Sequence, residues 1–138
     1  MDIVVNYFAV IVAAFVAFFA GWAWHSPLLF QRPWMRLMGY QSQQDAMGGS
    51  VAPMQAMALN AVANLVVAYV LAHFSVLFGV ADYIGALTLG FWAWFGFVVP
   101  TSLNNVLWEK KSWALYGFNI AYFLVTIEIM ALIVGLWR

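Results

Sequence analysis

The sequence predicts an all-α integral membrane protein: four transmembrane helices in a bundle, with a short interfacial helix in the first loop. Of the 138 residues, 67% are hydrophobic and 7% are charged, and the mean hydropathy is +0.92. Soluble domains carry roughly 25% charged residues. The apolar residues fall into four long runs, each close to the roughly 20 residues that a helix needs to cross a bilayer. Residues 1–138 are therefore expected to form one transmembrane domain.

The four runs place the expected spans at about residues 3–24, 53–78, 83–107 and 113–137. Each run is apolar on all sides and lacks the alternation that marks the strands of a membrane barrel. We interpret the first run as a retained span and not as a cleaved signal peptide. No basic residue precedes it, and no A-x-A site follows it.

The first loop, residues 25–52, holds the predicted interfacial helix. Ser26–Pro27 has the pattern of an N-cap followed by a first helical turn. The apolar residues that follow are interrupted by Arg32, Pro33 and Arg36. This mixture is typical of a helix that lies in the membrane interface with its apolar side down. A polar segment, QSQQDAMGGS, completes the loop.

The positions of Lys and Arg predict the orientation. Arg32, Arg36, Lys110 and Lys111 lie in loops one and three, and only Arg138 lies on the opposite side. This bias of four to one predicts that loops one and three are cytoplasmic and that both termini are outside. An aromatic belt is expected at the proposed cytoplasmic boundary, formed by Trp22, Trp24, Trp34, Trp108 and Trp113.

Composition and motifs exclude several classes of function. The formal net charge is zero, so there is no basic face for nucleic acid. The chain has no cysteine, which excludes disulfides, iron–sulfur clusters and thiolate zinc sites. Paired catalytic carboxylates, an H-E-x-x-H motif and a glycine-rich phosphate loop are also missing from the sequence. We therefore expect no enzymatic activity, no metal and no cofactor, apart from one alternative given below.

Glu128 is the only acid deep within a predicted span. Such a residue costs about 2.5–3.5 kcal/mol even on insertion scales, so it is a functional hypothesis by default. It shares a helical stripe with small residues, which allow helices to approach closely. We expect its side chain to lie in a helix–helix contact, either as a proton or cation site or as a hydrogen-bonded group that holds helices together. The stripe comprises Gly117, Ala121, Leu124, Glu128, Ala131 and Gly135.

His73 is the only histidine inside a predicted span. Its depth differs from that of Glu128 by about 6 Å at 1.5 Å per residue, so we expect the two side chains to be hydrogen-bonded. One histidine can also ligate a haem or chlorin, which leaves cofactor binding as an alternative. His25 follows the first span and is expected to interact with groups of the loop.

Asparagines gather in the half of the spans nearest to loops one and three. Asn60 and Asn64 are four residues apart on the second span, Asn104 and Asn105 end the third, and Asn119 begins the fourth. Asparagines between helices contribute about 0.6 kcal/mol each as hydrogen-bonding groups. A convergent cluster of them would instead line a vestibule for a small solute. Both interpretations are kept.

The first span carries small residues at every fourth position. This spacing places them on one face of the helix, where they allow a neighbouring backbone to come close. The series predicts where helices meet and says nothing of what they do. Its members are Ala9, Ala13, Ala17 and Gly21.

Several segments of the chain are distinctive, namely GWAWHSPLLF at residues 21–30 with Trp34–Met35, Leu103–Asn105 before Trp108–Glu109, Ser112–Trp113, and residues 119–122. Together they resemble a family of small bacterial four-helix membrane proteins, domain of unknown function seventeen-sixty-one. The family pattern often has Tyr at the position of His25, Gly at that of Gln31 and His at that of Phe123. The resemblance implies the fold and a bacterial inner membrane, and it implies no activity.

Four packed helices enclose side chains and no pore, so transport would require an oligomer. We expect a non-enzymatic membrane component that self-associates or acts as an accessory or structural subunit of a larger complex. Its partners are then the lipid bilayer and either further copies or other membrane subunits. The first alternative is an oligomeric small-solute or proton-coupled transporter or channel that uses Glu128. The second is a haem- or chlorin-binding subunit that uses His73.

Overall fold

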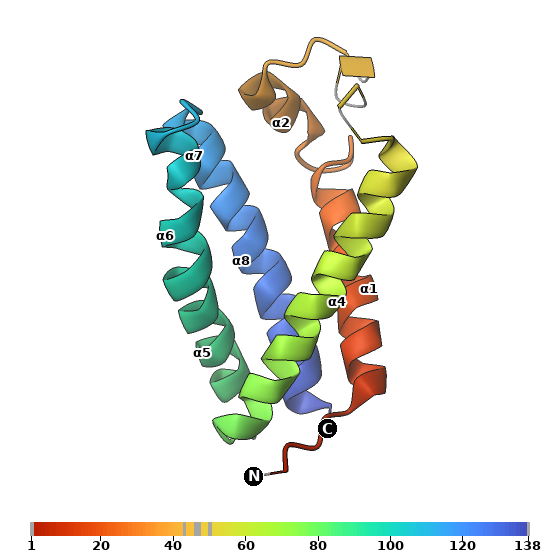
Figure 1. Ribbon diagram of the computed structural model, residues 1–138, viewed down its shortest axis with the longest axis vertical. Helices are drawn as coiled ribbons and strands as arrows, with labels where there is room; N and C mark the ends of the chain where they lie inside the picture. Colours follow the sequence, from red (N-terminus) through yellow and green to blue (C-terminus); the bar gives the residue numbers. More distant parts are fainter. Residues whose placement is uncertain (1, 43, 46–47, 50, 138) are drawn as a thin grey trace.

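Four long helical stretches make up the computed structural model, which describes residues 2–42, 44–45, 48–49 and 51–137 (Figure 1). Each stretch is long and apolar enough to cross a membrane, and no strand occurs in the described part of the chain. The predicted all-α class with four candidate spans is therefore confirmed. The stretches are α1 (Tyr7–Trp24), α4 (Pro53–Leu77), Tyr83–Leu107, and α8 (Trp113–Leu136).

Helix α1 begins at Tyr7, which is later than the predicted start near residue 3. The Oδ1 atom of Asn6 accepts hydrogen bonds from the backbone amides of Phe8 (3.1 Å) and Ala9 (3.2 Å). An N-cap of this kind contributes about 1 kcal/mol to a helix. Hydropathy alone placed the start too early, because the apolar residues before Asn6 look like part of the span.

The short helix of the first loop is α2, Gln31–Met38, and it ends at Gly39 in the left-handed conformation (φ 77°). It begins later than Ser26–Pro27 predicted. The Ser26 hydroxyl donates to the Ala23 carbonyl (2.7 Å) and accepts from the Leu28 amide (3.3 Å). Ser26 therefore closes a turn after α1 and does not cap α2. The predicted polar segment after α2 lies partly outside the described residues.

The third stretch is irregular in its second half. Helix α5 (Tyr83–Ala93) passes into the π-helical turn η1 (Trp94–Val98) and then into two short helices, α6 (Val99–Ser102) and α7 (Asn104–Leu107). Pro100 has no amide hydrogen to donate to the preceding turn, which explains the break in the α-helical pattern. The Thr101 hydroxyl donates to the carbonyls of Phe97 and Val98 in the same segment.

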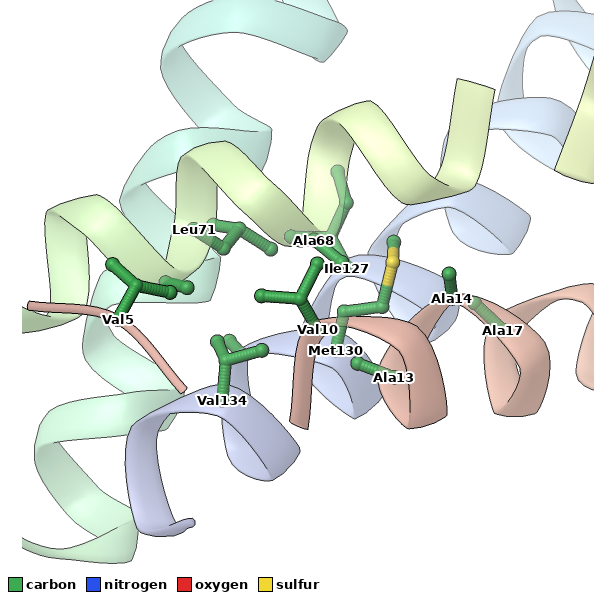
Figure 2. Close-up of a cluster of buried hydrophobic side chains, with 12 residues drawn as sticks. Val5, Val10, Ala13, Ala14, Ala17, Ala68, Leu71, Ile127, Met130 and Val134 are labelled. Atoms are coloured by element: carbon green, nitrogen blue, oxygen red, sulfur yellow. The ribbon is translucent and has the colours of Figure 1, made fainter. Parts of the chain in front are cut away.

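Helix α8 packs against α1, α4 and α5, so it is the common neighbour of the other long helices (Figure 1). Figure 2 shows side chains of α1, α4 and α8 converging in one cluster. Small residues let these helices approach closely. The predicted series on α1, Ala9, Ala13, Ala17 and Gly21, is buried along its whole length.

We predict that Ala17→Leu destabilises the bundle. Ala17 is 0% exposed, so the added methylene groups must push α1 away from its neighbours, and overpacking costs about 1–3 kcal/mol. The adjacent Val16 is 40% exposed, and Val16→Leu serves as the matched control with little effect. Unfolding titrations with SDS in mixed micelles measure both variants. Equal stability of the two would show that this face of α1 is not tightly packed.

Candidate functional site

Glu128 packs against a glycine of the neighbouring helix α5. A Cβ atom added at Gly90 would collide with Oε1 of Glu128 and would lie 3.0 Å from its Cδ. The Oε1 atom is buried, and it forms no hydrogen bond with any residue that the structure describes. The carboxyl group therefore lies in a helix contact, where Gly90 provides the room for it, and one of its oxygens has no partner there.

The stripe of small residues around Glu128 has a covered half and an uncovered half. Ala131 and Gly135 are buried, and a Cβ added at Gly135 would lie 3.0 Å from the Cβ of Ala86 on α5. Gly117 is exposed, with no atom within 4 Å of an added Cβ, and Ala121 is half-buried. The prediction of close packing at Gly117 is therefore wrong within the chain.

Gly117 is exposed because the third stretch contacts different sides of α8 at different positions along the helix. Near the middle of the helix, the third stretch contacts the side that carries Glu128. Farther toward loop three it contacts α8 at Tyr116, whose hydroxyl donates to the Val99 carbonyl (2.7 Å), and at Ile120, whose carbonyl accepts from Trp94 Nε1 (2.7 Å). These residues precede Gly117 and Ala121 by one position, which is about 100° around the helix.

His73 is not the partner of Glu128. Its Nδ1–H donates to the Tyr69 carbonyl (2.8 Å) within α4, and the two rings lie 4.3 Å apart. The predicted hydrogen bond between His73 and Glu128 is therefore wrong. The residues that α4 buries here are Ala68, Leu71, Ala72 and Ser75, and His73 lies at the edge of that face. Its proposed ligation of a haem or chlorin stays a prediction.

The asparagines bond within their own segments. The Asn64 amide donates to the Asn60 side chain (3.1 Å), and the Asn104 amide donates to the Thr101 carbonyl (3.2 Å). Asn105 and Asn119 are half-buried. Among the described side chains, none of these asparagines forms a hydrogen bond between helices, so the structure does not support their predicted role as interhelical groups. Asn60 instead lines a cleft.

That cleft, about 490 Å³ in volume, opens between α1, α2, α4 and α8. From the sequence, His25 was expected to interact only with groups of the loop, and Tyr122 carried no prediction of its own. Both line this cleft, with their rings 4.9 Å apart. A Cβ added at Gly21 would lie 2.5 Å from the Tyr122 hydroxyl. Gly21 thus leaves room for that hydroxyl. The only signal in the sequence was the run of polar and aromatic residues at the end of the first span.

The imidazole of His25 is held in one orientation. Its Nδ1 lies 2.9 Å from the Gly21 carbonyl, which can only accept a hydrogen bond, so Nδ1 carries the hydrogen. Burial lowers the pKa of His25, and the bond to the Gly21 carbonyl opposes this shift to a smaller extent. At neutral pH the ring is therefore uncharged, and Nε2 is a hydrogen-bond acceptor.

The lowered pKa of His25 predicts a loss of stability in mild acid. An unfolded histidine takes up a proton near pH 6.5, whereas folded His25 does so only at a lower pH. The free energy of unfolding should therefore fall as the pH drops below about 6.5. Thermal unfolding in detergent at pH 7.5 and pH 5.5 should show a smaller acid-induced loss for His25→Phe than for wild type. His73→Phe, which leaves His25 in place, is the control. An identical loss in all three proteins would contradict the assignment to His25.

One protein family of unknown function matches most of the chain. No curated protein and no solved structure matches it. The family described as "Protein of unknown function (DUF1761)" matches residues 8–135, which include all four long helical stretches apart from the ends of the first and last. This match agrees with the resemblance seen in the sequence. The chain belongs to the DUF1761 family.

Proposed function

We propose that the protein is a non-enzymatic membrane component that self-associates through the face of α8 that carries Glu128. The observation that carries this proposal is the stripe of α8 that runs from the half-buried Glu128 to the exposed Gly117, because no described residue covers Gly117. The Oε1 atom of Glu128 is buried against Gly90 of α5 and has no hydrogen-bond partner among the described residues. It lies about 12 Å from the end of α8, at 1.5 Å per residue. A buried polar atom left without a partner costs about 1–3 kcal/mol.

A second copy of the chain can cover the part of this stripe that α5 leaves open. Gly117 is exposed and Ala121 is half-buried, so another helix can approach α8 closely beside Glu128. A two-fold axis along the membrane normal places the two copies of each residue at equal depth, so the exposed part of one Glu128 side chain can lie near that of the other. A protonated carboxyl both donates and accepts, and two such groups satisfy each other.

The same carboxyl favours one alternative, a proton-coupled transporter or channel formed by the oligomer. In that case Glu128 carries a proton during transport, as intramembrane acids of pumps and transporters do. The two functions differ in what they require of the side chain. Self-association requires only its shape and hydrogen bonds, whereas transport requires that it release the proton.

We also propose a bacterial inner membrane, with loops one and three in the cytoplasm. The four-to-one bias of Lys and Arg toward these loops supports the orientation. Helices α2 and α7 lie together at one end of the bundle, and the labelled termini lie at the other (Figure 1). The proposed cytoplasmic charges are therefore on one side.

Two substitutions test the role of the Glu128 carboxyl in self-association and in transport. Glu128→Gln keeps the shape and the hydrogen bonding, so the oligomer should persist in native mass spectrometry of protein released from nanodiscs. Glu128→Ala leaves a cavity and no hydrogen-bonding group, so the oligomer should dissociate. If Glu128→Gln assembles normally but abolishes a proton flux measured in proteoliposomes, transport is the function. Normal assembly of Glu128→Ala would contradict the proposed interface.

The interface itself is tested at two glycines. Gly117 and Gly96 are both exposed, with no atom within 4 Å of an added Cβ, so a larger side chain fits the single chain at either position. Gly117→Leu should prevent a second helix from approaching α8 and should yield monomers. Gly96→Leu lies on the third stretch and should leave the oligomer intact. Oligomers that resist Gly117→Leu would place the contact on another face.

Orientation is tested by labelling cysteines, since the natural chain has none. Ser42→Cys should be protected from a membrane-impermeant thiol reagent in intact cells, because loop one is cytoplasmic. A cysteine appended after Arg138 should be labelled. Permeabilised cells, in which both positions react, provide the control. The opposite labelling pattern would reverse the orientation.

A further inference from the structure

The seam between α1 and α4 contains a row of adjoining cavities. The cleft beside His25 and Tyr122, about 490 Å³, shares Phe18 with an apolar cavity of about 190 Å³. That cavity shares Ile11 and Leu65 with a third one, of about 320 Å³, which extends toward Tyr7 and Tyr69. The row therefore has a polar end near loop one and an apolar remainder along the helices.

The polar end offers hydrogen bonds of both kinds. Nε2 of the neutral His25 is an acceptor, because Nδ1–H is engaged with the Gly21 carbonyl. The Tyr122 hydroxyl can donate, and it forms no hydrogen bond with a described residue. The Asn60 amide group adds further donors, since its Oδ1 already accepts from Asn64.

The walls of the cleft favour a flat, uncharged group. None of the described residues that line it carries a charge, so nothing there neutralises a phosphate or carboxylate. Trp22, Trp34 and Phe18 contribute aromatic faces, and Trp34 lies 5.0 Å from the His25 ring. Aromatic rings pack well against such faces, and the cleft volume is in the range of small-ligand sites, about 300–1,000 Å³.

We propose that this row of cavities binds a neutral amphiphile with a hydroxyl-bearing aromatic ring, of the phenol or hydroquinone class, and an apolar tail. The ring lies between His25, Tyr122 and the tryptophans, donates its hydroxyl hydrogen to Nε2 of His25, and accepts from the Tyr122 hydroxyl. The tail passes Phe18 into the apolar cavities between α1 and α4. The bilayer supplies the ligand laterally, so no aqueous path is required.

This site is independent of the Glu128 face. Tyr122 and Glu128 are six positions apart on α8, which places them about 120° apart around its axis. A protein that fails to self-associate can therefore still bind the amphiphile, and a failure of binding leaves the proposed interface untouched.

The probes are a decyl-substituted hydroquinone and its dimethyl ether, which keeps the ring and the tail, is larger by two methyl groups and has no hydrogen to donate. Binding to the full chain in nanodiscs is measured by equilibrium dialysis under nitrogen, with empty nanodiscs subtracted. The hydroquinone should bind saturably, and the ether about fivefold to tenfold more weakly, since one hydrogen bond is lost. The ¹⁵N resonance of His25 Nε2 should shift on addition of the hydroquinone, whereas that of His73 should not.

Variants locate the site. His25→Phe and Tyr122→Phe should each weaken hydroquinone binding about fivefold to tenfold, because each removes one hydrogen bond. His73→Phe is the matched control, because His73 also donates from Nδ1 to the carbonyl four residues earlier but lies outside the cleft. Equal binding of the two probes, unchanged affinity in both cleft variants, a stationary Nε2 resonance or the lack of saturable binding to wild type would each overturn the proposal.

Discussion

The close approach of α8 to α1 on one side and to α5 on the other is the contact on which the rest of the structure depends. It is possible because the residues at these contacts are small: Ala13 and Ala17 on α1, and Gly90 on α5. Larger side chains would separate the helices, since interiors are close-packed and a single extra methylene is felt. With these backbones close together, α4 completes the core around Met130 (Figure 2).

The same contact places the two polar groups of α8 in different surroundings. Glu128 lies beside Gly90, where one of its oxygens is enclosed by apolar groups. Tyr122 faces α1, where Gly21 leaves space for its hydroxyl and His25 lies next to its ring. Both sites thus depend on a glycine of a neighbouring helix. A helix that is apolar nearly all round thus carries one polar group in its contact with α5 and another at a cleft.

The irregular third stretch explains why one half of α8 is covered and the other is not. The π-helical turn at Trp94–Val98 and the proline after it change the direction from which this stretch meets α8. Trp94 and Tyr116 then tie the two helices together through backbone carbonyls. Gly117 remains uncovered as a result. The break in the helix therefore has a structural consequence at the face that we propose as the interface.

The sequence by itself determined the number, the approximate bounds and the apolar character of the spans, because crossing a bilayer requires long runs of apolar residues. It also identified the small residues of α1 that are buried, since their spacing defines a face. Missed local signals, the Asn6 cap and the turn at Ser26, account for the errors at two helix starts. These were available in the sequence.

Only the tertiary structure decided which residues meet. The spans are apolar all round, so no amphipathic pattern tells which side of each helix faces the core. Similar depth predicted that His73 is the hydrogen-bond partner of Glu128. The rotation of the helices instead places Gly90 of α5 beside the Glu128 carboxyl and leaves His73 bonded to Tyr69. His25 and Tyr122 are far apart in the sequence and meet because α1 and α8 cross beside Gly21. Helix rotation and crossing are set by side-chain packing between helices, and a single span does not contain that information.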